Sequence, residues 1–498
     1  MLASVDSAVL EGVDGRVVTV EVHVSNGLPG YTVVGLPDAA GRESRERVRA
    51  ALLSSGLAFP IKRVTVNLAP ASIRKAGSGL ELAIALALTS ADGDLPAGVL
   101  DGVAVLGELG LDGAVRPVAG TLALVDAVAR AGADSVIVPA ANAAEAALVP
   151  DVHVRNARSL GELLACLKGE APWPDPPDPD AEADDGADPD EPLDLADVHG
   201  LANARLALSA AAAGGHHLLL VGPPGIGKTM LARRLPTIMP TLERDAALEV
   251  TRIHSAAGRS TVSTLQTEPP FRAPHHSASS VALVGGGSPR VRPGEITLAH
   301  RGALFLDELP EFPMSVLEGL RQPLEERVVR ISRASGTLEF PADFLLVACA
   351  NPCPCGRKAL ECRCGDAQRM RYSRRLSAPL LDRFDLRLRI DAAGSEAGES
   401  SEETRARVTA AIQRQRTRLV GTRWRRNAHI PAGALEALAS LPRDAHAAWD
   451  DACRLRRLTG RGAARVRRVA RTFADLADRA VVTADDVMRA AWLREDVW

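Results

Sequence analysis

Residues 218–229 read LLLVGPPGIGKT, four apolar residues followed by a glycine-rich turn that ends in Lys228 and Thr229. The turn matches G-x-x-x-x-G-K-[ST], in which backbone N–H groups surround phosphates, the lysine reaches the β- and γ-phosphates and the hydroxyl binds magnesium. The apolar run before it predicts a buried strand, and the residues after it predict a helix. The stretch therefore predicts an α/β domain that binds ATP and Mg²⁺. The residues of the loop are Gly222, Pro223, Pro224, Gly225, Ile226, Gly227, Lys228 and Thr229.

A second apolar strand, residues 303–306, ends in the acidic pair Asp307 and Glu308. We expect Asp307 to hold magnesium through water and Glu308 to polarise the water that attacks the γ-phosphate. An exposed acidic pair at a strand end is the alternative. The order of the two motifs along the chain favours the catalytic interpretation.

A third apolar strand, residues 345–350, ends in Asn351, which is placed to hydrogen-bond the γ-phosphate or the attacking water. Short buried strands that each end in a polar segment are typical of a doubly wound sheet with its site at the carboxyl ends. Farther along, Arg383 and Arg461 could neutralise transition-state charge, the first from a neighbouring subunit and the second from the same chain. Ordinary surface arginines are the alternative.

The length of 498 residues is too great for a single core, and the sequence divides into four parts. Residues 1–167 alternate strand-like and helix-like runs, which predicts a mixed α/β domain. Residues 168–193 form an acidic linker rich in Pro and Asp. The ATPase domain follows at residues 194–395, and residues 396–498 show only helical patterns.

Composition indicates a cytoplasmic protein with no membrane partner. The N-terminus lacks a basic start before an apolar block, and no apolar run is long enough to span a bilayer. Net charge is −3, but residues 401–498 hold 20 Arg against 12 Asp and Glu. This basic end region is a hint of nucleic-acid binding, although solvated helix faces are often rich in Arg.

The cysteines are clustered, which does not suggest the disulfide framework of a secreted protein. Four of them form two C-x-C pairs, and a structural zinc held by all four thiols is the natural use. Free or redox-active thiols are the alternative. The four candidate ligands are Cys353, Cys355, Cys362 and Cys364, and the three expected bystanders are Cys166, Cys349 and Cys453.

Together these residues resemble the magnesium-chelatase-like AAA+ ATPases of the YifB/ComM type. The strings that carry the resemblance are FRAPHHS (271–277), LVGGG (283–287), RPGEI (292–296), LDELPEF (306–312) and LLDRFD (380–385). The resemblance implies a homo-oligomeric ring, a hexamer in this family, with ATP between subunits and a C-terminal helical lid domain. It also implies that Arg383 is an arginine finger acting in trans and that Arg461, or its neighbour Arg465, is sensor 2.

The first 167 residues resemble the Lon-protease-like domain of the same family, in GLPG (27–30), VGLPD (34–38) and NLAPA (67–71). A Lon-type peptidase needs a serine nucleophile and a lysine that takes its proton. The alignment places Gly79 at the nucleophile and Leu122 at the lysine, with Ser78 one residue away. We therefore expect a scaffold or interaction surface without peptidase activity.

Residues 324–340 predict a β-hairpin just before the Asn351 strand. Related helicases place such a hairpin in the central channel, so Arg330 and Arg333 are the expected DNA contacts. A hairpin that only packs neighbouring subunits is the alternative. His275 and His276 are expected on a second loop that enters the channel, with loop contacts or phosphate sensing as their roles; a role as zinc ligands is a weaker alternative.

The leading functional hypothesis is an ATP-driven ring that moves single-stranded or branched DNA without sequence preference. The resemblance implies branch migration in recombination or in the uptake of transforming DNA. A remodeller of a protein partner, as in magnesium chelatase, is the second hypothesis. An ATP-dependent protease is the third, and the missing Ser-Lys pair argues against it.

Overall fold

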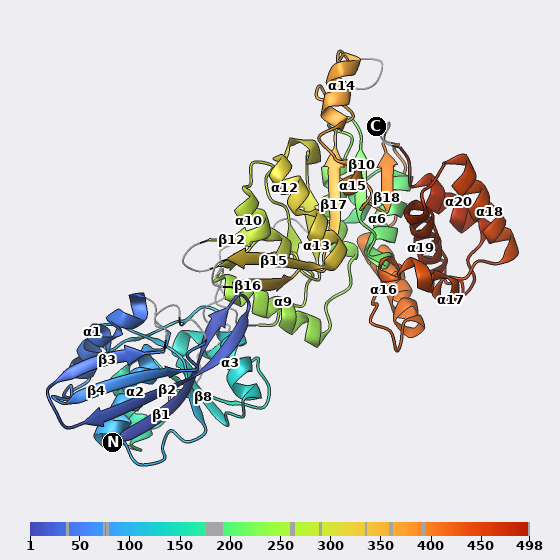
Figure 1. Ribbon diagram of the computed structural model, residues 1–498. Helices are drawn as coiled ribbons and strands as arrows, with labels where there is room; N and C mark the ends of the chain where they lie inside the picture. The colour runs from blue at the N-terminus through green and yellow to red at the C-terminus, as the bar shows by residue number, and fades with distance from the viewer. Residues whose placement is uncertain are drawn as a thin grey trace.

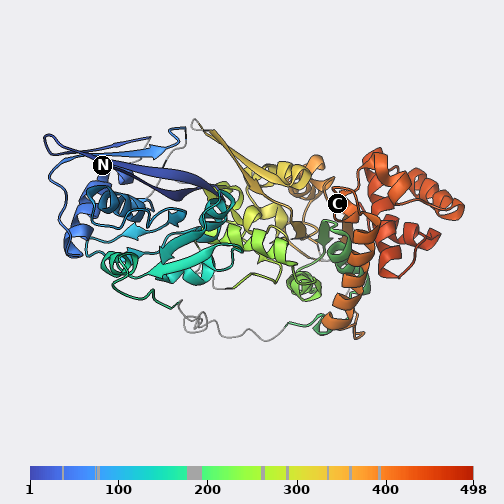
Figure 2. The same cartoon turned by 90° about the horizontal axis from the view of Figure 1, so that it is seen from below.

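The computed structural model describes residues 1–35, 39–72, 75, 79–175, 193–258, 264–287, 291–333, 336–357, 362–390 and 394–496. Its N-terminal, central and C-terminal parts lie one after another along the long axis of the molecule (Figures 1 and 2). Most of the predicted linker, residues 176–192, lies outside the described residues, as does Ser78. None of the described helices is long and apolar enough to cross a bilayer.

The N-terminal part is built on a mixed sheet in the order β3-β4-β2-β1-β5-β8-β9. Alternate residues of the second strand, Val18, Val20 and Val22, are fully buried, as expected for a sheet with one face on a core. Its strands are β1 (Leu2–Glu11), β2 (Asp14–Ser25), β3 (Gly30–Val34), β4 (Arg63–Ala69), β5 (Val103–Val105), β8 (Ser135–Pro139) and β9 (His153–Ala157), with a small ladder of β6 (Glu108–Leu109) and β7 (Val115–Arg116). Its helices are α1 (Ala39–Ser54), α2 (Glu81–Asp92), α3 (Thr121–Arg130), α4 (Ala143–Ala146) and α5 (Leu160–Leu167).

The central part contains a parallel sheet in the order β11-β14-β17-β10-β18. In β10, Leu218 and Leu220 face one apolar cluster while Leu219 and Val221 face another, so helices cover both faces. The strands are β10 (Leu218–Val221), β11 (Phe271–Arg272), β14 (Ala303–Leu306), β17 (Leu345–Ala350) and β18 (Leu386–Arg389). The mixed α/β, multidomain architecture is therefore confirmed.

The remaining elements of the central part surround this sheet. Its helices are α6 (Ala202–Gly214), α7 (Lys228–Arg233), α8 (Leu235–Ile238), α9 (Arg244–Ala257), α10 (Ser280–Val284), α11 (Glu295–Leu298), α12 (Met314–Gly319), α13 (Arg321–Glu326), α14 (Asp366–Ser373) and α15 (Ala378–Leu381). Two ladders lie outside it, β12 (Gly285–Gly286) with β13 (Arg292–Pro293), and β15 (Val328–Arg333) with β16 (Gly336–Pro341).

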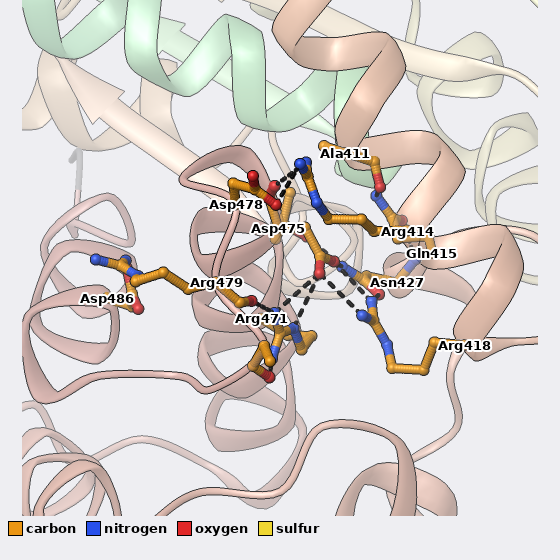
Figure 3. A network of polar contacts seen from close by, with 12 residues as sticks. Ala411, Arg414, Gln415, Arg418, Asn427, Arg471, Asp475, Asp478, Arg479 and Asp486 are labelled. Atoms are coloured by element: carbon orange, nitrogen blue, oxygen red, sulfur yellow. Dashed lines mark hydrogen bonds and ion pairs between the residues drawn. The ribbon is translucent and has the colours of Figure 1, made fainter.

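The C-terminal part holds α16 (Ser401–Arg418), α17 (Leu435–Leu438), α18 (Arg443–Leu455), α19 (Gly460–Leu476) and α20 (Ala484–Trp492). The buried carboxylate of Asp475, on α19, joins α16 and the segment at Asn427 to its own helix (Figure 3). It accepts hydrogen bonds from Arg418 at 2.6 and 2.9 Å, from Arg471 at 2.9 Å and from Asn427 at 2.8 Å. Both arginines pair with this one carboxylate, so its negative charge is compensated inside the protein.

The N-terminal part packs directly on the central part, through contacts between α3 and α9. Arg252 of α9 lies 3.4 Å from a carboxylate oxygen of Asp14, and the turn between β1 and β2 places Val13 in the central apolar cluster. A side chain at Gly12 would lie 3.4 Å from the ring of Phe340 on β16. The N-terminal sheet therefore contacts the base of the β15–β16 hairpin.

Candidate functional site

The loop that follows β10 has the geometry of a phosphate-binding loop. Gly225 and Gly227 have φ of +75° and +97°, a conformation that side chains disfavour, and Gly227 precedes the first turn of α7. Lys228, the first residue of α7, donates from Nζ to the carbonyl oxygens of Gly222 at 2.6 Å and Pro223 at 2.9 Å. Burial lowers the pKa of this ammonium. The fold thus holds a positive charge within the curve of the loop.

The predicted catalytic side chains from three strands meet at this loop. The hydroxyl of Thr229 donates to Asp307 Oδ2 at 2.7 Å, and Lys228 Nζ lies 3.3 Å from Asn351 Oδ1. Parallel strands β10, β14 and β17 bring them together, because their carboxyl ends share one edge of the sheet. A hydroxyl and a carboxylate are the hard oxygen ligands that Mg²⁺ prefers, so Thr229 and Asp307 fit the ion.

Glu308 lies beside these groups with its carboxylate half exposed. Its backbone has φ of 51°, and its N–H donates to Asp307 Oδ1 at 2.9 Å. His276 Nδ1 lies 3.4 Å from Glu308 Oε2, and the rings of His275 and His276 are 4.0 Å apart, centroid to centroid. His276 therefore lies beside Glu308, where a phosphate-sensing role, one of the two expected for this loop, would place it. The signal that could have placed it is its position just after β11, next to β14 in the sheet.

Arg383 lies at the opposite edge of the sheet from the phosphate loop. It precedes β18, whose Leu386 pairs with Leu218 at the start of β10, whereas the loop begins after Val221. Three strand steps separate these ends, about 10 Å. The guanidinium of Arg383 donates to Glu325 at 2.5 Å. Arg383 is thus directed away from the nucleotide site of its own chain.

Arg461, in the first turn of α19, shares a cavity with Arg383, and that cavity has no residue of the phosphate loop in its lining. Arg461 therefore lies in a cavity apart from the phosphate loop, and its role at a nucleotide stays a prediction. Arg461 is exposed and has no hydrogen bond or ion pair within the described part of the chain. Arg465 instead pairs with Asp382 at 3.1 Å and Asp385 at 2.8 Å.

The hairpin that was expected to contact DNA starts later than predicted. Helix α13 occupies residues 321–326 and ends at Arg327, which has a left-handed backbone, so the strand begins at Val328. Arg330 is paired with Glu339 at 2.7 Å and also with Glu326. Arg333 donates to the carbonyl oxygen of Gly287 in the neighbouring glycine loop. Residues 334–335, at the turn, lie outside the described residues.

The four predicted thiol ligands lie together immediately after the Asn351 strand. The Sγ atoms of Cys353, Cys355, Cys362 and Cys364 all lie within 4.8 Å of one another. This is the one cluster of His, Cys, Asp or Glu suited to a metal among the residues that the structure describes, and it does not include His275 or His276. Cys166 and Cys349 are buried, whereas Cys453 is partly exposed.

The two positions that a Lon-type peptidase would use lack the required groups. Leu122 is 2% exposed and packs in an apolar cluster. A side chain at Gly79 would face Val118 at 3.5 Å. The backbone N–H of Leu122 donates to Glu145, which also accepts from Ser255 of α9. This region therefore contacts the central part of the molecule.

Comparison with known proteins agrees with this geometry. The family described as magnesium chelatase, subunit ChlI, matches residues 194–397, its C-terminal region matches 398–494, and subunit ChlI of Mg-chelatase matches 20–142. The uncharacterized protein Rv2897c of Mycobacterium tuberculosis is 45% identical over 98% of each chain. YifB of Salmonella typhimurium is 42% identical over 95% of this chain and 93% of its own. Competence protein ComM of Haemophilus influenzae is 40% identical, over 95% and 94%. The chain therefore belongs to the YifB/ComM type of magnesium-chelatase-like AAA+ proteins.

Proposed function

We propose that this protein is an ATP-hydrolysing ring motor that moves DNA, with each ATP site completed by a neighbouring subunit. One observation carries the proposal. Lys228, Asp307 and Asn351 meet at one edge of the central sheet, while Arg383 lies at the other edge. On this proposal, a single chain supplies the phosphate-binding half of a hydrolytic site at one edge and, at the other, an arginine that would exchange Glu325 for the nucleotide of a neighbour.

Hydrolysis at this site would divide among the described side chains. Lys228 would bind the β- and γ-phosphates, and Thr229 and Asp307 would hold a magnesium ion, which would supply positive charge against the phosphate oxygens. Glu308 is half exposed beside Asp307, where its carboxylate can accept a proton from the attacking water. Asn351 orients that water or the γ-phosphate, because its amide already lies beside Lys228.

The arginines support a ring, which we propose to be a hexamer. Arg383 and Arg461 line the same cavity, so both could approach the nucleotide of the next subunit. Arg461 suits the role of sensor 2 better than Arg465 does, because Arg465 is already engaged by two carboxylates of its own chain. Positive charges brought in by a neighbour stabilise the transition state of phosphoryl transfer.

DNA is the proposed substrate because two loops that suit a channel lie side by side. Arg333 of the hairpin contacts Gly287, and a side chain at Gly285 would lie 3.2 Å from Ile331. Arg330 is paired with two glutamates, so it would have to exchange them for DNA phosphates. Binding should therefore be sequence-independent and weaken with salt. One relative is named a competence protein, which supports a role in DNA uptake. Branch migration, during uptake or recombination, is the activity that we propose for the motor.

The remaining assignments are part of the same proposal. Residues 1–167 serve as a Lon-like scaffold without peptidase activity, 168–193 as a linker, 194–395 as the motor and 396–498 as the helical lid. The seven free thiols suit the reducing conditions of the cytoplasm. A remodeller of a protein partner remains the second candidate, because Arg330 is already neutralised within the chain.

The deciding experiment mixes the purified protein with forked and four-way DNA junctions and ATP at low salt. We expect ATP-dependent junction processing and DNA-stimulated hydrolysis, with both lost in Lys228→Ala. Arg330→Ala/Arg333→Ala should keep basal hydrolysis but lose the stimulation. Junctions that stay intact, with hydrolysis indifferent to DNA, would favour a protein substrate instead.

A further inference from the structure

The described sulfur atoms of the four-cysteine loop, residues 353–364, are arranged as a metal would require. Cys353 Sγ lies 3.3 Å from Cys355 Sγ and 3.4 Å from Cys362 Sγ, and the latter two are 3.7 Å apart. Four thiolates around a tetrahedral zinc, with Zn–S bonds of about 2.3 Å, are about 3.8 Å from one another. We propose that these four thiols hold a zinc ion and that the ion controls ATP hydrolysis by supporting the phosphate loop.

The thiols are not joined as disulfides, and their ligand chemistry favours a soft or borderline metal. All four are free cysteines, separated by well over the roughly 2 Å of a sulfur–sulfur bond. Cys353 is buried, and its carbonyl oxygen accepts a hydrogen bond from Gly356 N–H at 3.0 Å. This bond closes residues 353–356, here called the first knuckle, into a tight turn; residues 362–365 are the second knuckle. Four sulfurs in a closed set leave no open position, which is typical of a structural zinc site.

The first knuckle rests on the nucleotide site. Gly356 has φ of +69°, and a side chain there would lie 3.0 Å from Cδ of Pro224 in the phosphate loop. The same position is 3.8 Å from the amide nitrogen of Asn351. One turn of the four-cysteine loop therefore touches both the loop that binds phosphate and the asparagine that faces it.

The far end of the four-cysteine loop returns to the same asparagine. Helix α14 starts directly after Cys364 and projects beyond the end of β17 (Figure 1). Its buried residue Tyr372 is hydrogen-bonded to the backbone of Asn351. The residues on either side of the four thiols thus contact the nucleotide site, and a metal held by those thiols would link the two C-x-C pairs.

The effect of the metal on nucleotide binding and hydrolysis rests on the proposed ATPase function. With the metal bound, Gly356 stays against Pro224 and supports the phosphate loop and Asn351 from outside. Without it, the knuckle is free to move off, and nucleotide affinity and hydrolysis should fall. The fold itself should survive, because the apolar clusters of the central sheet hold none of the four thiols.

Metal content of the full-length protein tests the site directly. We expect about one zinc per chain in the wild type and in Cys453→Ser, a thiol outside the cluster, and little in Cys353→Ser/Cys355→Ser. Replacement of zinc by Co²⁺ should give the visible absorption of tetrahedral cobalt thiolate. Equal metal in the double variant and the wild type, an absence of metal from both, or iron in place of zinc would overturn the zinc site.

A pair of glycine variants tests the coupling with the thiols left in place. Gly356→Ala should retain zinc but lose about 10-fold or more in nucleotide affinity or hydrolysis rate, since its side chain strains a left-handed turn and meets Pro224. Gly365→Ala, at the second knuckle, meets nothing within 4 Å and should match the wild type. A zinc-loaded Gly356→Ala with wild-type affinity and rate would overturn the coupling. A zinc-loaded wild type that neither binds nor hydrolyses ATP would overturn the proposed function and the coupling, but not the metal site.

Discussion

The nucleotide site and the Asp475 cluster are both rich in charged side chains, but they differ in how far those side chains are buried and paired. Around Asp475, two arginines and Asn427 satisfy a fully buried carboxylate (Figure 3). At the nucleotide site, Glu308 is half exposed and its carboxylate has one ion-pair contact, with His276. In the cavity that Arg383 lines, away from the phosphate loop, the exposed side chain of Arg461 has no partner in the described part of the chain. The first arrangement holds the fold together, and the second leaves charges available for a ligand.

This difference teaches how to separate structural from functional charges in a chain with many arginines. A charged group that is buried and fully paired costs stability when its partner is removed. Removal of an exposed, unpaired group changes stability little. If such a group proves to be required for activity, its role is therefore in the reaction. The predictions below use this contrast, from the largest expected change in free energy to the smallest.

Asp475→Ala should be the most damaging change to stability. It leaves Arg418 and Arg471 partly buried without their shared carboxylate, at a cost of about 3–5 kcal/mol. Urea denaturation followed by circular dichroism measures this loss. Unfolding parameters equal to those of the wild type would mean that the cluster does not hold the C-terminal helices.

Glu308→Gln should slow ATP hydrolysis and leave the stability of the fold unchanged. Loss of the general base predicts a rate of ATP hydrolysis lower by about 10²–10⁴-fold with the melting temperature unchanged. Glu311→Gln, three residues along the same motif and exposed, is the matched control and should hydrolyse ATP normally. Equal rates in the two variants would remove Glu308 from its catalytic role.

Arg461 and Arg465, one helical turn apart, should behave in opposite ways. Arg461→Ala should lower the hydrolysis rate about 10-fold or more without affecting folding, because the role proposed for this arginine is to contribute charge only to a neighbour's nucleotide. Arg465→Ala leaves the buried Asp385 with one ion pair fewer and should lower the melting temperature. If instead Arg465→Ala lowered only the hydrolysis rate and Arg461→Ala only the melting temperature, Arg465 would be the catalytic arginine and Arg461 the structural one.

Asp485→Ala should give the smallest change in the free energy of unfolding. Its ion pair with Arg489 lies on the exposed face of α20, where such i,i+4 pairs contribute about 0.3–0.5 kcal/mol. Urea denaturation should therefore barely distinguish this variant from the wild type. A loss comparable with that of Asp475→Ala would show that burial does not decide the effect of a charge here.

Features set by neighbouring residues could be predicted from the sequence. β10 and β14 have the predicted bounds, because short apolar runs that end in a loop motif are unambiguous. Thr229, Asp307 and Asn351 could be brought together in advance, since parallel strands share one carboxyl edge. The bounds of β1 do not follow from local pattern, because the polar Ser7 lies on its buried face between Val5 and Val9.

Features set by packing between distant segments could not be predicted. The contact of Gly356 with Pro224 joins residues 132 positions apart, and that of His276 with Glu308 depends on the pairing of β11 with β14. The placement of Arg461 depends on how α19 docks against the central sheet. The Asp475 cluster joins α16, α19 and the segment at Asn427, and no local pattern marks these residues as partners.

The central claim is that one subunit's arginines complete another subunit's ATP site, and mixing variants tests it most directly. Lys228→Ala and Arg383→Ala/Arg461→Ala should each be inactive alone. Mixed rings contain interfaces that combine an intact phosphate loop from the second variant with intact arginines from the first, so hydrolysis should partly return. Mixed rings, verified by differential tagging, that remain as inactive as either variant alone would contradict the account.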